Sequence, residues 1–299
     1  MEIVSNKIKG KQYLYLEHSY RNKTGKITKK KQYLGKEIPE NIEEIKKQFI
    51  NEINKEIWHE SLDNIKKNFN KEFYKLPLTA KKKYEENFLI KFTYNTNKIE
   101  GSTITLKETT RLLQEGRAPN KPIKDIKEIE SHKKVFEEML NEKNNLSLEL
   151  INKWHKKLLQ GIDDEIAGKI REHEVAIAGS KFEPPQPNEL KYLLRQFIQW
   201  YNNNTKKGTS KEKTHPVEMA ALVHLKFVTI HPFTDGNGRI SRILMNFILR
   251  KNKYPLLDIT YTGRNNYYNA LERSQTKQEE RIFVMHIVKR YIKEYKKYT

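Results

Sequence analysis

The turn HPFTDGNGR, residues 231–239, constrains this chain more than any other short stretch. The apolar helical pattern VEMAALVHLKFVTI leads into it, and the pattern ISRILMNFILR leads out of it. Two helices are therefore expected to meet at a connection that holds a histidine, a carboxylate, two glycines and arginine. The simplest interpretation of so much polar and backbone-permissive chemistry in one turn is a phosphate site with a base beside it.

Helical periodicity extends over most of the chain from Pro39 onward. The predicted helices cover 40–74, 79–98, 102–116, 123–143, 147–160, 187–204, 216–230, 239–252 and 278–297. Two stretches interrupt them. Residues 168–187 contain a Gly-Ser pair and two consecutive prolines, which predict a short hairpin or flap, and residues 254–266 predict an irregular connection. The expected fold class is mostly α, a helical bundle with a short β-hairpin flap.

Residues 1–36 differ from the rest of the chain. The alternating segments GKQYLYLEHSY and ITKKKQYLG, joined by the turn NKTG at 22–25, predict a β-hairpin. This segment holds ten Lys or Arg against two Glu, a net charge of +8. Aromatic and basic side chains on such a ribbon suit nucleic acid or an acidic partner. The alternative is a solvated edge hairpin packed on the main body.

The composition excludes several kinds of functional site and indicates where in the cell to expect the protein. The 299 residues include no cysteine, which excludes disulfides, thiolate zinc sites and a cysteine nucleophile. No apolar run reaches the length of a membrane span and no secretory signal is recognised, so we expect a cytoplasmic protein without a membrane partner. The net charge of +20 suits nucleic acid, anionic nucleotides or acidic partners, but lysines spread along the whole chain are also typical of a generally basic surface.

The second half of the turn has the composition of a phosphate cradle. Gly236 and Gly238 bracket Asn237, and a helix begins directly afterwards. Backbone N–H groups of such a turn converge on an anion, and the helix N-terminus adds partial positive charge. Arg239 and Arg242 lie three positions apart, so both can reach the same anion. Neither a P-loop nor a dinucleotide-binding fingerprint is present.

The first half of the turn supplies the groups for chemistry. Asp235 before the cradle is a candidate Mg²⁺ ligand, because that ion needs few protein carboxylates when phosphates are present; the alternative is a turn or N-cap residue. His231 is a candidate base for a hydroxyl, or else a buried hydrogen-bonded residue. A zinc set of His215, His224 and His231 is not favoured, because the spacings lack an i, i+4 pair.

The segment HPFTDGNGRISR matches in full the HxFx(D/E)GNGRxxR signature of the Fic domain, and the order of elements from about 83 to 297 also resembles that family. Most such proteins transfer AMP from ATP to a protein hydroxyl. The resemblance implies that His231 deprotonates a Ser, Thr or Tyr hydroxyl and that Asp235 holds Mg²⁺. It further implies that the backbone of 236–238, the Asn237 amide and Arg239 bind the α- and β-phosphates. Arg242 would meet the γ-phosphate.

The resemblance also assigns the surroundings of the nucleotide. The flap at 171–185 would dock the protein target as an added strand. The flap residues Ala176, Ile177, Ala178 and Gly179 would line the nucleotide. Tyr267, Tyr268 and Gln275 would form the adenine pocket, although the tyrosine pair is equally typical of ordinary helix packing.

A second motif resembles the inhibitory (S/T)xxxE(G/N) motif of the same family. It is TNKIEG, residues 96–101, and includes Thr96, Glu100 and Gly101. By this resemblance Glu100 would pair with Arg242 and so compete with the γ-phosphate for the same donors. Some family members also use this glutamate to remove AMP. The implied division of the chain is a basic hairpin extension at 1–38, a connecting helix at 39–78, an inhibitory helix region at 79–116 and a Fic catalytic core at 117–299.

The sequence thus predicts an autoinhibited protein adenylyltransferase that uses ATP and Mg²⁺. The protein target could be a second copy of the chain, and a homodimer is one alternative for its assembly. Two other functions stay open. One is a Fic relative that transfers UMP, phosphate or phosphocholine, and the other is a nucleic-acid- or partner-binding regulator that works through the basic hairpin.

Overall fold

The computed structural model describes residues 1–22, 25–205 and 214–299. The chain folds as two compact units. The smaller comprises Met1–Lys67 with Lys297–Thr299, and the larger comprises Asn68–Lys296.

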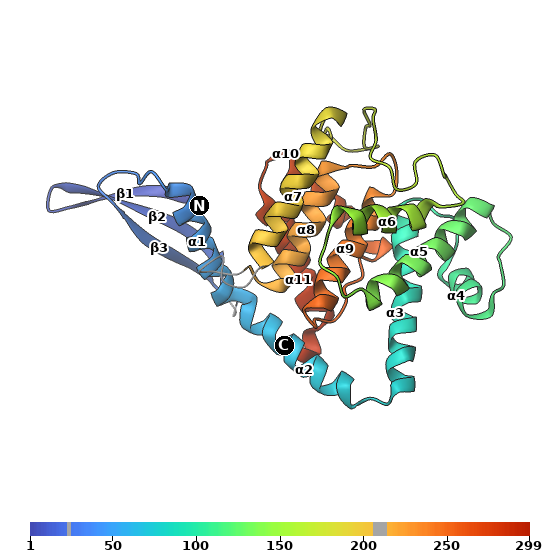
Figure 1. Cartoon of the computed structure of the whole chain (residues 1–299). Helices are drawn as coiled ribbons and strands as arrows, with labels where there is room; N and C mark the ends of the chain where they lie inside the picture. Colours follow the sequence, from blue (N-terminus) through green and yellow to red (C-terminus); the bar gives the residue numbers. More distant parts are fainter. Residues whose placement is uncertain (23–24, 206–213) are drawn as a thin grey trace. The chain divides into compact units, whose positions relative to one another are not determined.

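The smaller unit is an antiparallel sheet with a helix on one face (Figure 1). Its strands are β1 (Glu2–Ile8), β2 (Lys11–Arg21) and β3 (Ile27–Gly35), in the order β1-β2-β3. The predicted hairpin corresponds to β2 and β3, and β1 is a third strand that the sequence analysis missed. Of the predicted turn at 22–25, residues 23 and 24 lie outside the described part of the chain.

The helix predicted over 40–74 consists of α1 (Ile42–Asn54), a π-helical turn (Lys55–His59) and α2 (Glu60–Lys75). In α1 the side chains of Phe49 and Ile53, four positions apart, are buried against Leu16 of β2. Glu43 and Glu44 occupy the first turn of α1, where negative charge is favourable to the helix dipole.

In the part of the larger unit that the structure describes, all regular structure is helical (Figure 1). Its main helices are α3 (Leu78–Ile99), α4 (Leu106–Glu115), α5 (Ile123–Asn141), α6 (Leu148–Leu159), α7 (Leu190–Thr205), α8 (Pro216–Ile230), α9 (Asn237–Lys251), α10 (Arg264–Thr276) and α11 (Glu280–Glu294). The predicted mostly α fold is confirmed, with helix ends within a few residues of those expected. Helix α10 was not predicted, since residues 254–266 were interpreted only as an irregular connection.

Helices α8 and α9 form the centre of this unit. Side chains on several sides of both helices are buried, among them Val217, Phe227, Ile243 and Phe247. A helix that is apolar all round must be covered by others, and α7, α11, α5 and α6 pack against this pair. The loop between α8 and α9 is therefore fixed at both ends by the most buried helices of the chain. Among the described residues, no helix has the length and apolarity to cross a membrane.

Candidate functional site

The loop between α8 and α9 begins at His231, which ends α8 in the left-handed conformation, with φ 49° and ψ 56°. Its backbone N–H donates to the carbonyl of Phe227 at 3.1 Å, which closes the last helical turn. The ring Nδ1 lies 3.2 Å from the carbonyl of Val228. Because a carbonyl can only accept, Nδ1 bears the proton and Nε2 keeps the lone pair. The histidine is therefore held in the tautomer that a base requires.

The side-chain amide of Asn237 closes the loop. Its Oδ1 accepts from the backbone N–H of Phe233 at 2.9 Å, and its Nδ2 donates to the Phe233 carbonyl at 2.7 Å. The resemblance implies that this amide binds phosphate, and in the structure its two polar atoms both hydrogen-bond the backbone of Phe233. The backbone N–H at the start of α9 is the group that Asn237 can offer to an anion.

His155 of α6 supports the loop from beneath, a contact that the sequence analysis missed. Its ring stacks on Phe233 with centroids 3.6 Å apart, and its Nε2 donates to the Asp235 carbonyl at 2.9 Å. Its Nδ1 accepts from the Gly168 N–H at 2.9 Å. Burial lowers the pKa of His155 to about 4, so the ring stays neutral and can donate from Nε2 while it accepts at Nδ1.

Two glycines of the loop are needed for close approach. Gly236 has φ 81°, and a Cβ at this position would meet the His155 ring at 3.3 Å. Gly238 is helical, and a Cβ there would collide with the carboxylate of Glu100. The second glycine therefore leaves room for an anionic group directly at the N-terminus of α9.

Arg239 is buried between two carboxylates. Its NH2 group lies 2.9 Å from Asp235 Oδ2, and its NH1 lies 3.0 Å from Oε1 of Glu128 in α5. Burial would raise the pKa of Asp235, but the charge of Arg239 and the Gly236 N–H outweigh it and hold that pKa below its ordinary value. Asp235 is thus an ionised carboxylate in the loop. Glu128 was not singled out from the sequence.

Arg242 is also buried, and α3 supplies its partners. Its Nε donates to Thr96 Oγ1 at 2.6 Å, and its NH2 group makes an ion pair with Oε1 of Glu100. Glu100 follows the last residue of α3, and Gly101 then turns the chain with φ 100°. The motif TNKIEG therefore places its first and fifth side chains, Thr96 and Glu100, on Arg242. The Glu100 carboxylate fills the space in front of Gly238.

A neutral polar network lies behind Arg242. The hydroxyls of Tyr267 and Ser241 lie 3.0 and 3.1 Å from Nε2 of His224. Burial lowers the pKa of His224 well below its ordinary value, and the charge of Arg242 lowers it further. The network therefore carries no charge of its own that could compete with Glu100 for the guanidinium.

Arg171 joins the flap to the loop, and the sequence analysis missed it. This side chain is 3% exposed. Its Nε donates to the His231 carbonyl at 2.9 Å, NH1 to the His173 carbonyl at 2.8 Å and NH2 to the Pro185 carbonyl at 2.7 Å. Within 168–187 no strand pairing forms, although the chain turns at 177–180 as predicted. One guanidinium thus holds both arms of the flap where a ladder was expected.

The surroundings of His231 favour its neutral form. Burial is the largest cause that lowers its pKa, the Val228 carbonyl opposes it, and the charge of Arg171 lowers the pKa again. The imidazole therefore remains able to accept a proton below the pH at which a free histidine would already be protonated.

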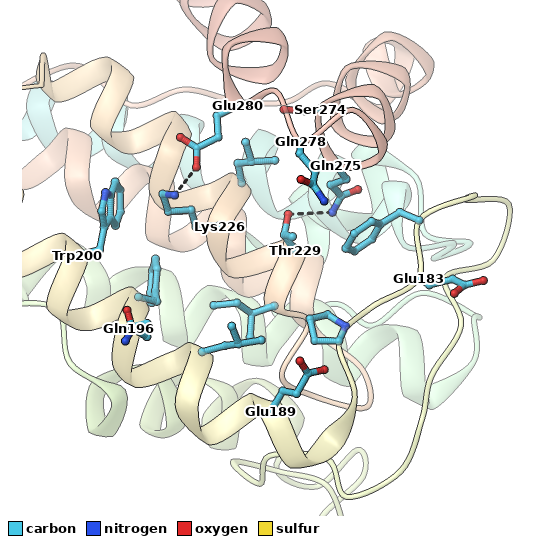
Figure 2. Close-up of a pocket in the computed structure, with 16 residues that line it drawn as sticks. Glu183, Glu189, Gln196, Trp200, Lys226, Thr229, Ser274, Gln275, Gln278 and Glu280 are labelled. Atoms are coloured by element: carbon cyan, nitrogen blue, oxygen red, sulfur yellow. Dashed lines mark hydrogen bonds and ion pairs between the residues drawn. The ribbon is translucent and has the colours of Figure 1, made fainter. Parts of the chain in front are cut away.

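The predicted adenine residues occupy different environments. Tyr267 is buried and its hydroxyl belongs to the His224 network, whereas Tyr268 is 43% exposed and donates to the Ile99 carbonyl at 3.2 Å. Gln275 lines a pocket of about 730 Å³ and donates from Nε2 to Thr229 Oγ1 at 3.1 Å (Figure 2). Tyr268 is therefore exposed and the buried Gln275 lines the pocket, whereas Tyr267 is enclosed by its neighbours.

The same pocket is bounded by the second arm of the flap, by α7 and by α8 (Figure 2). Lys226 and Glu280 form an ion pair across one end, with Lys226 Nζ 4.8 Å from the centroid of the Trp200 ring. Its volume is in the range of small-molecule sites. The predicted flap residues 176–179 are at most half-buried, and the N–H of Lys181 donates to Glu272 of α10 at 3.1 Å.

The histidines considered for zinc do not converge. His215 lies at the start of α8 against Tyr254, His224 belongs to the network behind Arg242, and His231 ends α8. Within the described ranges, no three His, Cys, Asp or Glu side chains gather closely enough to hold a metal by themselves. A metal at this site would need donors from a ligand as well as Asp235.

Comparison with known proteins shows what this architecture is similar to. Residues 145–249 match the Fic/DOC family. A Fic domain containing signaling protein from Bacteroides thetaiotaomicron superposes with a TM-score of 0.70 and 29% identity, over 78% of this chain and 94% of that one. A fragment of Fic-1 from C. elegans gives 0.68 and 26%, over 86% and 75%. These matches show that the chain has a Fic fold.

Similar sequences include proteins named Protein adenylyltransferase Fic. The one from Drosophila yakuba is 34% identical over 60% of this chain and 36% of its own length. The one from Nematostella vectensis is 32% identical over 74% of this chain and 51% of its own length. The chain therefore spans about a third to a half of these relatives.

Proposed function

We propose that this protein transfers AMP from ATP to a hydroxyl of a protein and is held inactive by Glu100. The observation that carries the proposal is the position of the Glu100 carboxylate, which occupies Arg242 and the space before Gly238 at the N-terminus of α9. Because this carboxylate belongs to the chain itself, it competes with the phosphates of ATP for the same hydrogen-bond donors. The names of the curated relatives support the same chemistry.

The chain's residues suit an in-line attack at the α-phosphate. His231 Nε2 takes the proton of the target hydroxyl, the hydroxyl oxygen bonds to the α-phosphorus, and the bond from that phosphorus to the bridging oxygen breaks as pyrophosphate leaves. The backbone N–H groups that begin α9, with Arg239 and Arg242, bind the phosphates. Catalysis then consists of positioning and charge neutralisation.

Asp235 fits a Mg²⁺ ion bound together with the nucleotide. Its side chain is half exposed and ionised, and Mg²⁺ commonly takes one carboxylate with phosphate oxygens and water. When bound, the ion would neutralise charge on the phosphates. Arg239, which holds Asp235 Oδ2 at 2.9 Å, would orient this carboxylate toward it.

The flap supplies the target-docking surface in this proposal. Arg171 ties its arms to the carbonyl of His231, so a backbone docked there is placed relative to the base. The adenine would lie between the flap and the exposed Tyr268, with Gln275 at its edge. Four further predictions are not part of this mechanism: removal of AMP through Glu100, a cytoplasmic location, a homodimer, and modification of a second copy of this chain.

The test is labelling of protein by ATP labelled at the α-phosphate, with Mg²⁺. We expect no label with the native chain, strong label with Glu100→Gly and none with Glu100→Gly/His231→Ala. The Glu100→Gly signal should exceed the background measured with the native chain about 5–150-fold, the range of typical coupling energies. Glu115→Gln, which changes an exposed carboxylate at the end of α4, is the matched control and should stay unlabelled.

Labelled UTP and ATP labelled at the γ-phosphate separate the alternatives. Label from γ-labelled ATP would indicate phosphate transfer, and preference for UTP would indicate another nucleotidyl group. Failure of Glu100→Gly to label with any of these donors, while it still binds nucleotide, would contradict the proposed function.

A further inference from the structure

The N-terminal sheet has one face covered by its own helix. Leu16 of β2 is fully buried against Phe49 and Ile53 of α1, with Ile3 and Leu34 beside it. Because side chains alternate along a strand, residues one position away from Leu16 point to the other face. That second face is not covered by α1.

Three tyrosines gather on the uncovered face. The rings of Tyr15 and Tyr33, which are directly paired across β2 and β3, have centroids 5.4 Å apart. Tyr13 lies 6.1 Å from Tyr33. Tyr33 is 54% exposed. The three rings form a contiguous aromatic platform in which Tyr33 is exposed and Tyr13 and Tyr15 are partly buried.

Lysines continue the same face beyond the tyrosines. Lys29 and Lys31 of β3 both contact the carboxylate of Glu17, each at 2.7 Å. Hydrogen bonds from both lysines lower the pKa of Glu17, so it remains ionised. One carboxylate cannot neutralise two ammonium groups, and the two lysine side chains are 62% and 45% exposed. Positive charge therefore remains in the middle of the face.

Charge in this unit is separated between sheet and helix. Residues 1–36 hold ten Lys or Arg and two Glu, a net charge of +8, whereas residues 37–67 hold five Lys and eight Asp or Glu, a net of −3. Lys30, on the covered face, is held by Glu52 and Glu56 of the helical segment. The excess positive charge is thus concentrated on the strands and their turns.

We propose that this uncovered face, defined by Tyr13, Tyr15, Tyr33, Lys29 and Lys31, binds single-stranded nucleic acid. Unpaired bases stack on exposed aromatic rings, and the adjoining lysines meet the phosphates. A paired duplex hides the faces of its bases and would leave the platform unused. An acidic protein segment would meet the lysines but has no need of three clustered rings. This surface lies in the smaller unit and does not depend on AMP transfer.

The experiment measures binding of the full chain to fluorescein-labelled oligonucleotides by anisotropy. The probes are a mixed-sequence single strand of about 16 nucleotides, as DNA and as RNA, and the duplex of the same sequence. We expect single strands to bind more tightly than the duplex and binding to weaken as salt rises from roughly 50 to 200 mM. Equal or tighter binding of the duplex would overturn the proposal.

Two variants test the two parts of the surface. Tyr33→Ala should weaken single-strand binding about 5–150-fold, as expected for the loss of one stacked base, and Tyr33→Phe should not. Lys29→Gln/Lys31→Gln should reduce the salt slope by about 1.4, because two phosphate contacts are lost and glutamine can still hydrogen-bond Glu17.

The matched control is Lys46→Gln/Lys47→Gln, which makes the same charge change on α1 of the same unit. It should leave affinity within about twofold. Equal losses in the two double variants would mean that net charge, not this face, attracts the probe, and would overturn the proposal. So would unchanged binding by Tyr33→Ala, since this half-exposed ring can be removed without loss of the core.

Discussion

The loop between α8 and α9 and the end of α3 lie close together where Glu100 meets Gly238 and Arg242, but they are held in different ways. Asn237, His155 and Arg171 fix the loop through its backbone. The end of α3 is attached to α9 through side chains, above all the pair of Glu100 and Arg242, and the Glu100 side chain is 31% exposed. The difference suits the proposed function, in which the loop keeps one geometry and ATP displaces the Glu100 side chain.

The largest effect is expected when the hydrogen bonds that hold the loop are removed. In a Glu100→Gly background, Asn237→Ala removes both hydrogen bonds to Phe233. We expect the rate of AMP transfer to fall about 100-fold or more, because small displacements of reacting groups cost that much. Steady-state labelling checks it, with Asn202→Ala on the surface of α7 as control. A fall of less than about threefold would show that the loop does not depend on this lock.

Competition between Glu100, at the end of α3, and ATP is tested by measuring how much each nucleotide stabilises the folded protein. In Glu100→Gly, ATP gains the donors of Arg242, so we expect ATP at 100 times its Kd to stabilise this variant by about 2.7 kcal/mol and the native chain by clearly less. Thermal unfolding measures the difference. AMP, which has no β- or γ-phosphate, is the control and should stabilise both proteins alike. Equal stabilisation of both by ATP would mean that Glu100 does not compete with it.

The charge of Arg171 is expected to affect the pH dependence of AMP transfer. The lowered pKa of His231 means that its neutral form persists as pH falls, so transfer by Glu100→Gly should be flat above pH 6.5 and decline only below it. Arg171→Met removes a positive charge that lowers this pKa, and the decline should then move to higher pH. We also expect about a tenfold lower rate from the loosened flap. An unmoved pH profile would limit Arg171 to a structural role.

The smallest effects should separate the two tyrosines of α10. Tyr268→Ala removes an exposed ring, and we expect about tenfold weaker ATP binding from lost stacking. Tyr267→Phe removes only the hydroxyl of a buried ring near His224, and we expect about 1 kcal/mol lower stability with affinity within about twofold. Calorimetric titration and thermal unfolding measure both. The reverse order would restore Tyr267 as the aromatic that meets the base.

Short-range features were predictable because neighbouring residues decide them. Pro232 disfavours the helical conformation at His231, so α8 ends before that residue. Pro77 likewise separates α2 from α3. The glycines of the loop marked a close approach of an anion, and helical periodicity located most of the helices. Strand β1 was missed because its segment is largely polar and pairs only with β2, so its alternation is weak.

The sequence by itself determined which chemical groups the loop carries and, through its resemblance to a family, the partner of Arg242. Only the tertiary structure decided how these groups are held. Arg171 reaches a carbonyl 60 positions away, and His155 reaches one 80 positions away. Glu128 meets Arg239 from another helix. Such contacts leave no periodicity or spacing in the sequence, because packing of helices α5, α6 and α9 brings them together.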